Sequence, residues 1–426
     1  MVALSVAAIA GVCSVMVAEP MLLVRSATGW LWQGDAMRVA VVAGPDPGHA
    51  FPAMALCLRF CAAGDEPILL TGSQWLDTAR RAGIEAVELD GLDATADDDD
   101  EDAGAKIHRR AAKMAVCNEQ RLRDLAPDLI VSDVITACGG MAADLIGLPW
   151  VELCPHPLYR PSKGLPPIGS GLAPGTGVRG RLRDTVMRAL TARSVRQGEA
   201  QRAQARGGIG LPALDPGPRR RLIATLPALE VPRPDWPAEA VIVGPLHFEP
   251  TDAALDVPDG TGPLVVVAPS TATTGTGGLA ELALETLVPG RSLPDGARVV
   301  VSRLGGAGVP VPPWAVVGLG RQDELLAAAD LVICGGGHGM VSKTLLAGVP
   351  MVVVPGGGDQ WEIANRLVRQ GSAELIRPLA ADELAAAVGA VLADPRYRAA
   401  ARRAGASAGA VADPVRVCHD ALAVAR

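Results

Sequence analysis

The chain has 426 residues and a formal net charge of −7, with 49% hydrophobic and 20% charged residues. This length and composition predict large buried cores and exclude a disordered protein. The acidic balance, with no basic stripe bearing aromatic residues, argues against nucleic acid as a partner. The eight cysteines form no CxxC pair. They indicate buried thiols of a reducing compartment, neither a disulfide framework nor a zinc site.

Residues 1–36 differ from the rest of the chain. The first 18 carry no charge, which leaves a signal peptide or a short membrane anchor as an alternative. No basic segment precedes this run, and Glu19 and Arg25 interrupt it before the roughly 20 apolar residues that a bilayer span needs. We expect an extension outside the fold, or an upstream start codon, with a cytoplasmic folded protein that begins at Met37. Membrane association is not predicted.

Between residues 37 and 225, short apolar runs alternate with helical patterns. Continuous β-branched runs are typical of strands covered on both faces of a parallel sheet. Alternation of such strands with helices predicts a doubly wound α/β domain. The predicted strands are RVAVVA, EPILLTG, IEAVELD, DLIVSD and WVELC, and the predicted helices are 51–63, 74–82, 104–125 and 137–146.

Two stretches of this half are predicted to be loops. Residues 97–102 are six consecutive carboxylates, and they lack the spaced ligands and turn glycine of a calcium loop, so a solvated loop is predicted. Residues 155–180 are dense in proline and glycine. Long loops of this kind usually line binding sites, so this one is a candidate for shaping a substrate pocket.

A change of composition separates the two halves. Proline recurs through residues 226–262, where AVIVG is the one short apolar run, so we predict an interdomain connection there. Strands resume in residues 263–395 and predict a second doubly wound domain, followed by an alanine-rich helical tail over 396–426. The predicted strands are LVVVAPS, ARVVVSR, AVVGLG, LVIC, MVVVPG and SAELIR, and the predicted helices are 279–287, 322–329, 340–347 and 361–369.

The most informative segment is 331–369. There LVIC leads into the glycine turn GGGHG (335–339) and a helix, and MVVVPGGG leads into Asp359 and a second helix. A glycine turn between a buried strand and a helix lets backbone N–H groups approach an anion, and the helix dipole favours negative charge. The same order of strand, turn and helix recurs at 37–64, with His49 on the connection. Two such halves predict a cleft.

These features together resemble the inverting glycosyltransferases of GT-B fold, and within them the UDP-glucuronosyl, plant natural-product and bacterial macrolide branch. The resemblance rests on two Rossmann-like halves, the His49 connection, and GGGHG followed by GVPMVVVPGGGDQ. It spans 37–426 and is most specific over 336–369. It implies two doubly wound parallel-sheet domains that face each other across a cleft. It also implies transfer of a sugar from a UDP- or TDP-linked donor to a hydroxyl of an apolar small molecule or lipid, with no metal ion or other cofactor.

The resemblance assigns roles to residues of both halves. His49 would accept the proton of the acceptor hydroxyl, and Asp133 would orient His49 and stabilise its charged form. Their residue types alone leave open a solvated histidine and an aspartate that caps the next helix. Asp359 could likewise be a helix N-cap. The donor-binding residues would be Ser270, Thr271, Gln322, Gly336, Gly337, His338, Gly339, Asp359 and Gln360.

Several positions depart from the pattern of these enzymes. Gly335 replaces a phosphate-binding histidine, Met340 a hydroxyl residue and Lys343 an acidic residue. Leu319 stands where a tryptophan usually holds the nucleotide base. The departures leave a second interpretation, a catalytically inactive GT-B protein that binds nucleotide sugar or supports a partner enzyme. A nicotinamide-dependent oxidoreductase is a weaker third, because GPDPGHAF is not a GxGxxG fingerprint.

Overall fold

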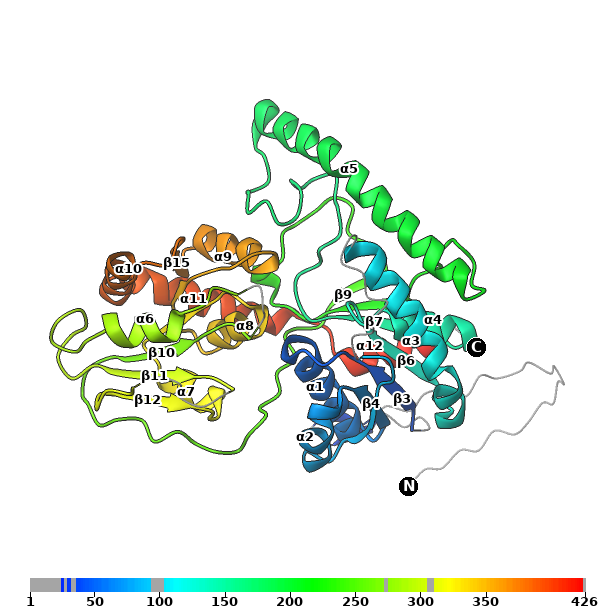
Figure 1. Cartoon of the computed structure of the whole chain (residues 1–426), viewed down its shortest axis with the longest axis horizontal. Helices are drawn as coiled ribbons and strands as arrows, with labels where there is room; N and C mark the ends of the chain where they lie inside the picture. The colour runs from blue at the N-terminus through cyan, green and yellow to red at the C-terminus, as the bar shows by residue number, and fades with distance from the viewer. Residues whose placement is uncertain are drawn as a thin grey trace, which may run out of the picture. The chain divides into compact units, whose positions relative to one another are not determined.

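Two parallel β-sheets, each covered by helices, form the chain from Met37 onward (Figure 1). The computed structural model describes residues 24–26, 29–31, 36–92, 103–271, 275–304 and 310–423. Residues 1–36 and 37–426 are separate compact units. In the first unit, strands β1 (Val24–Ser26) and β2 (Gly29–Leu31) pair antiparallel. The rest of the predicted extension and the acidic run 97–102 lie outside the described residues.

The first sheet has the strand order β5-β4-β3-β6-β7-β8-β9, and all of its pairs are parallel. Alternate residues of β3 point to opposite faces, so Val39 and Val41 pack with α1, α2 and α12, while Ala40 and Val42 pack with α3 and α4. The strands are β3 (Arg38–Val42), β4 (Glu66–Thr71), β5 (Glu85–Glu88), β6 (Leu129–Asp133), β7 (Trp150–Cys154), β8 (Arg220–Ile223) and β9 (Ala240–Ile242). The helices are α1 (Pro47–Ala63), α2 (Leu76–Arg81), α3 (Ala103–Leu125), α4 (Cys138–Ile146) and α5 (Gly177–Gly208), with 3-10 turns at Ser73–Trp75 and Pro227–Leu229.

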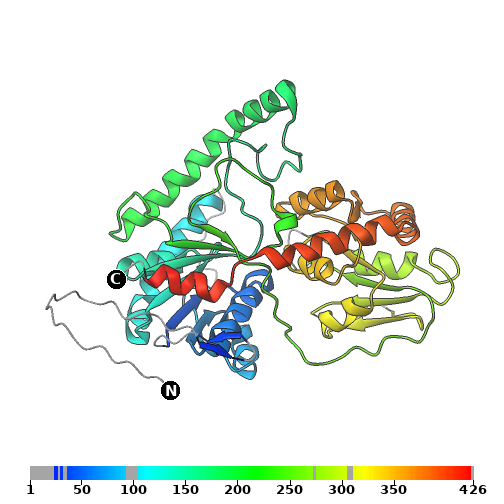
Figure 2. The same cartoon turned by 180° about the vertical axis from the view of Figure 1, so that it is seen from behind.

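The second sheet has the order β12-β11-β10-β13-β14-β15, again all parallel. Figure 2 shows the sheets and their helices from behind. One face packs against α7, α8, α9 and α11, and the other against α6 and α10. The strands are β10 (Leu264–Ala268), β11 (Arg298–Ser302), β12 (Ala315–Gly318), β13 (Leu331–Cys334), β14 (Met351–Val353) and β15 (Ala373–Leu375). The helices are α6 (Leu279–Thr286), α7 (Gln322–Ala328), α8 (His338–Leu346), α9 (Asp359–Gln370), α10 (Ala381–Ala393), α11 (Pro395–Ala406) and α12 (Pro414–Ala423), with a 3-10 turn at Ser407–Ala410.

The predicted fold class, two doubly wound parallel sheets, is confirmed, and every predicted strand is present. In the first α/β domain, one helix and two strands were not predicted. Helix α5 is a long helix whose side chains are mostly exposed, so it lacks the apolar periodicity that reveals a packed helix. Strand β8 begins with two arginines, which hide a strand of four residues. Strand β9 lies inside the range predicted as a connection, 226–262, and extends the first sheet instead.

Strand order places the ends of particular strands together. In each sheet the first strand, β3 or β10, lies between the second and the fourth, so connections leave it in opposite directions. Ligands of doubly wound folds bind at such switch points, beyond the carboxyl ends of the strands. His49 follows β3 and Asp133 ends β6. Ser270 follows β10, and the turn 335–339 follows β13.

The last helices contribute to both cores. Ala401 and Ala404 of α11 pack in the second core, whereas Val415 and Cys418 of α12 pack against the first sheet. The predicted domain boundaries remain predictions. Within the residues described, no helix combines the length and hydropathy that crossing a bilayer requires.

The contact between α8 and α11 supplies a test of this packing. A Cβ on Gly405 of α11 would overlap the main-chain oxygen of Leu345 in α8, whereas a Cβ on Gly389 of α10 would meet nothing within 4 Å. We expect Gly405→Ala to lower the free energy of unfolding by about 1–3 kcal/mol through overpacking. The matched control Gly389→Ala should raise it by about 0.5–1 kcal/mol through helix propensity. Urea unfolding measures both, and equal effects would refute the close approach.

Candidate active site

His49 and Asp133 form a hydrogen-bonded pair at the carboxyl end of the first sheet. His49 lies in the first turn of α1, and its Nδ1 is 2.7 Å from Oδ2 of Asp133. Asp133 is only 1% exposed, and its Oδ1 accepts the N–H groups of Ile135 and Thr136 at 3.0 and 3.1 Å. The carboxylate therefore holds His49 with one oxygen and closes the turn before α4 with the other. Helix α4 itself has Ala137 as N-cap and no side-chain cap.

The protonation of His49 is set by opposing effects. Burial lowers the pKa of His49, but the hydrogen bond to Asp133 and the charges of Asp133, Asp46 and Asp359 outweigh it and raise the pKa above its ordinary value of 6.5. Because Nδ1 faces a carboxylate, Nδ1 carries the hydrogen in the neutral ring, and Nε2 keeps the lone pair that can take a proton. This is the geometry of a general base that is oriented by a carboxylate.

The glycine turn after β13 leads into helix α8, whose first backbone N–H groups have no hydrogen-bond partner inside the helix. Gly336 has φ +80°, and a Cβ there would lie 3.2 Å from the main-chain oxygen of Gln360. Added Cβ atoms at Gly337 and Gly339 would meet nothing within 4 Å, so the turn is not filled by side chains there. Helix α8 starts at His338 without a side-chain cap, so its first N–H groups have no intrahelical partner. Such a helix start suits an anion.

The side chain of His338 is buried and faces protein groups. Its Nε2 lies 2.8 Å from Oγ1 of Thr225, and the carbonyl of Pro155 accepts a hydrogen bond from the ring. Burial, together with nearby His156 and His247, lowers the pKa of His338 to about 3. His338 is therefore a neutral link to the first sheet, and what it offers an anion is its main-chain N–H.

Gln360 and Ser270 bond to each other beneath the turn. Nε2 of Gln360 donates to Oγ of Ser270 at 2.9 Å, and the N–H of Gly356 donates to Oε1 of Gln360 at 3.0 Å. Asp359 and Thr271 are exposed. Asp359 is the first residue of α9, which has no side-chain cap, so the alternative that Asp359 is an N-cap is not observed. The carboxylate of Asp359 is thus open to a ligand.

Lys343 does not bring an unpaired charge to the turn. Its Nζ is 2.6 Å from Oε1 of Glu249 and 3.0 Å from Oε1 of Gln322. Gln322 also donates to Oγ of Ser302 at 3.3 Å. The predicted base-binding residue Gln322 therefore belongs to a polar network with Lys343, and Leu319 near it is 36% exposed.

The loop predicted to shape a substrate pocket is bound to α9. Oε2 of Glu362, a residue 5% exposed, accepts the N–H groups of Gly169 and Gly171 at 3.2 and 3.0 Å. Nη1 of Arg369 donates to the carbonyl of Gly171 at 2.7 Å, and Nε1 of Trp361 to that of Ser170 at 3.3 Å. Helix α9 thus carries Asp359 at its start and holds this loop along its length.

Sequence reasoning did not identify His156 and Tyr159. His156 follows β7, the neighbour of β6, and its ring centroid is 6.5 Å from that of His49 with the planes at 77°. The rings of His156 and Tyr159 stack at 4.6 Å and 15°. A signal was available, because the carboxyl ends of strands in the predicted parallel sheet share one edge, which brings together the residues after DLIVSD and WVELC.

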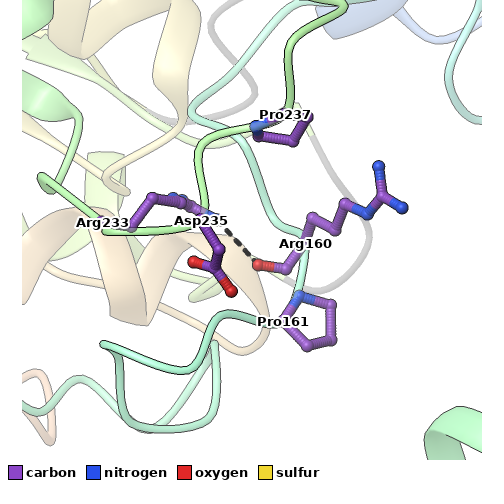
Figure 3. A pocket seen from close by; sticks show the side chains of 5 residues that line it. All are labelled: Arg160, Pro161, Arg233, Asp235 and Pro237. Carbon is purple, nitrogen blue, oxygen red and sulfur yellow. Dashed lines mark hydrogen bonds between the residues drawn. The ribbon is translucent and has the colours of Figure 1, made fainter.

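A cavity of about 320 Å³ borders the segment that carries His156 and Tyr159 (Figure 3). Arg233 is buried beside it and donates to the carbonyls of Arg160 and Leu158 at 2.8 and 2.7 Å, which fixes this segment. No predicted site residue lines the cavity. Its lining residues are Arg160, Pro161, Arg233, Asp235 and Pro237. Across the described part of the chain, no three His, Cys, Asp or Glu side chains gather as metal ligands would.

Comparison with known proteins agrees with this architecture. Residues 315–424 match the domain family "Erythromycin biosynthesis protein CIII-like, C-terminal domain". The chain is 28% identical over 399 residues to 4'-demethylrebeccamycin synthase of Lentzea aerocolonigenes, covering 86% of this chain and 94% of that protein. It is 27% identical over 389 residues to zeaxanthin glucosyltransferase of Pseudescherichia vulneris, covering 82% and 90%.

Solved structures show the same fold. The glycotransferase of kitacinnamycin superposes with a TM-score of 0.68 at 21% identity, covering 92% of this chain and 99% of that one. The glycosyltransferase SnogD of Streptomyces nogalater gives 0.68 at 21%, covering 92% and 100%. The chain therefore has the GT-B fold. With the near full-length relatives, it is a glycosyltransferase, as the sequence predicted, and it is similar to enzymes of the UDP-glycosyltransferase type.

The buried imidazoles make stability depend on pH. Burial lowers the pKa of both His338 and His247 to about 3, against 6.5 ordinarily. The folded chain binds fewer protons, so this stabilisation is complete above pH 6.5 and is lost as the pH falls toward 3. At pH 5.5 each imidazole should have lost about 1.4 kcal/mol.

Urea unfolding at pH 7.5 and 5.5 checks this. The variant His247→Asn, which keeps a hydrogen-bonding group beside Ser342, should show a smaller loss than the unmodified protein. Equal losses in the two proteins would contradict the assignment for His247.

Proposed function

We propose that this glycosyltransferase is inverting and needs no metal ion or other cofactor, and that it moves a sugar from a nucleoside diphosphate to a hydroxyl of an apolar natural product or lipid. The observation that carries the proposal is the environment of His49. Its imidazole is bonded to Asp133 and also feels the charge of Asp359, the exposed carboxylate at the start of α9. The proposed base His49 is therefore close enough to Asp359, the residue proposed to hold the sugar, to be affected by its charge.

The proposed reaction is a single displacement. Nε2 of His49 takes the proton of the acceptor hydroxyl while the oxygen attacks the anomeric carbon, and the bond from that carbon to the diphosphate oxygen breaks. Attack from the face opposite the leaving group inverts the anomeric configuration. Asp133 stabilises the imidazolium that forms. The amides of the turn around Gly337 and the dipole of α8 stabilise the departing diphosphate, which is the work that a metal ion does elsewhere.

The donor is proposed to be UDP- or TDP-linked. SsfS6 of Streptomyces sp. SF2575, a structural neighbour with a TM-score of 0.61 and 19% identity, has been solved with thymidine diphosphate. Asp359 is open and can accept hydrogen bonds from sugar hydroxyls. Ser270, Thr271 and Gln360 lie at the switch point of the second sheet, where a nucleotide phosphate is expected. Gln322 is proposed to contact the base of the nucleotide.

The acceptor is proposed to be apolar. The spinosyn rhamnosyltransferase SpnG, a neighbour with a TM-score of 0.65 and 19% identity, has been solved with spinosyn aglycone. The relatives compared above are named for rebeccamycin and zeaxanthin chemistry. The loop held by Glu362 and Trp361 is the proposed wall of the acceptor site.

Replacing His49 separates catalysis from nucleotide binding. We expect His49→Ala to abolish product formation while UDP or TDP, but not NAD, still raises the melting temperature, because the turn after β13 is untouched. His419→Ala is the matched control, since His419 forms a similar pair with Asp65 at 2.9 Å on α12. Thermal shift and product chromatography are the measurements. Undiminished turnover in His49→Ala would remove His49 from the mechanism, and nucleotide binding without transfer by the unmodified protein would favour the inactive alternative.

The role of Asp133 can be tested through the pH profile. For the unmodified enzyme kcat/KM should rise with pH through an apparent pKa above 6.5, because the base must be neutral. Asp133→Asn keeps an oxygen for the N–H groups of Ile135 and Thr136 but removes the charge. We expect kcat/KM to fall by about 10²–10⁴ and the apparent pKa to move to lower pH. An unchanged pH profile would contradict the proposed role.

A further inference from the structure

His156 lies beside the proposed base on the same edge of the first sheet. It follows β7, which pairs with β6, and β6 ends at Asp133. The ring of His156 stands edge to face with that of His49, with 6.5 Å between the centroids. The charges of Asp133 and Asp359 reach both imidazoles. A substrate bound for proton transfer to His49 is therefore next to His156.

The hydrogen bond of Nδ1 defines which nitrogen of His156 is free. Nδ1 is 2.7 Å from the carbonyl oxygen of Pro157. A carbonyl only accepts, so Nδ1 carries the hydrogen and Nε2 carries a lone pair. Within the described residues, no protein group hydrogen-bonds this Nε2. Burial, reinforced by neighbouring His49, lowers the pKa of His156, so the ring stays neutral.

The ring of His156 is held in place from two sides. The Pro157 carbonyl fixes its Nδ1, and Tyr159 stacks on its face at 4.6 Å. Tyr159 is in turn 5.9 Å below the guanidinium of Arg366, which belongs to α9. The Nε2 lone pair is thus a preorganised hydrogen-bond acceptor, which is the kind of group that fixes the orientation of a bound molecule.

We propose that Nε2 of His156 accepts a hydrogen bond from a second donor group of the acceptor substrate, a hydroxyl or N–H next to the hydroxyl that receives the sugar. The proposal rests on the glycosyl transfer proposed above. The rings of His49 and His156 lie with their centroids 6.5 Å apart, so one molecule can reach both, with its reacting hydroxyl at His49 and a neighbouring donor group at His156. The substrate class is therefore an apolar molecule with vicinal donors, such as a 1,2-diol or a catechol. His156 is a specificity-determining residue.

Matched acceptors test the proposal with the full chain. Each aromatic acceptor with two adjacent hydroxyls is compared with its mono-O-methyl ether, which keeps one hydroxyl and blocks the other. The unmodified enzyme should favour the diol by about tenfold or more in kcat/KM, mainly through KM, since the ether leaves Nε2 unpaired. His156→Phe keeps a ring to stack on Tyr159 and should bring the two acceptors within about twofold. His156→Gln, which offers an amide oxygen, should restore part of the preference.

Control measurements separate the possible outcomes. His108→Phe, the same change on α3, should retain the preference of the unmodified enzyme, and thermal unfolding reports whether each variant is folded. Equal turnover of diol and ether by the unmodified enzyme, or a preference that survives in His156→Phe, would overturn the proposal. So would a rise in the KM of the sugar donor alone, because His156 would then contact the donor. If the unmodified enzyme glycosylates no acceptor at all, the function proposed above fails, and this inference with it.

Discussion

The hydrogen bond between His49 and Asp133 depends on the register of the first sheet. The two residues are 84 positions apart, and they meet because β3 and β6 are neighbours with Val42 beside Ser132. A slip of one residue would turn every side chain of β6 to the other face and remove Asp133 from His49. The buried carboxylate also requires its partners, because an unpaired charge there is costly. The order and register of the strands therefore determine the contact between His49 and Asp133, and this contact raises the pKa of His49.

Helix α9 joins the proposed donor side to the proposed acceptor side. Its first residue, Asp359, is open to a ligand, and its later residue Glu362 binds two amides of the loop proposed to enclose the acceptor. Arg366 reaches Tyr159, which supports His156. Helix α9 therefore connects the residue proposed to hold the sugar with the loop proposed to enclose the acceptor.

The sequence predicted the sheets because their strands are buried on both faces and contain continuous apolar runs. It missed α5, since an exposed helix needs no apolar stripe, and it missed β8, whose arginines conceal a strand. The family resemblance predicted that Asp133 would orient His49, and the two side chains are hydrogen-bonded, but it did not reveal the partners of the other polar groups. Lys343 forms an ion pair with Glu249, and His338 forms a hydrogen bond with Thr225. Such choices depend on contacts between segments far apart in sequence, and no local pattern encodes them.

Burial and neighbouring carboxylates determine which of the buried histidines has a raised pKa. His156, His247 and His338 lose solvent without gaining a carboxylate partner, so their pKa values fall and they stay neutral. His49 is also buried, but Asp133 and other carboxylates more than compensate, and its pKa rises. In the proposed reaction, the proton of the acceptor is therefore expected on His49, the more basic of the two rings. That difference allows two imidazoles 6.5 Å apart to serve one as base and the other as hydrogen-bond acceptor.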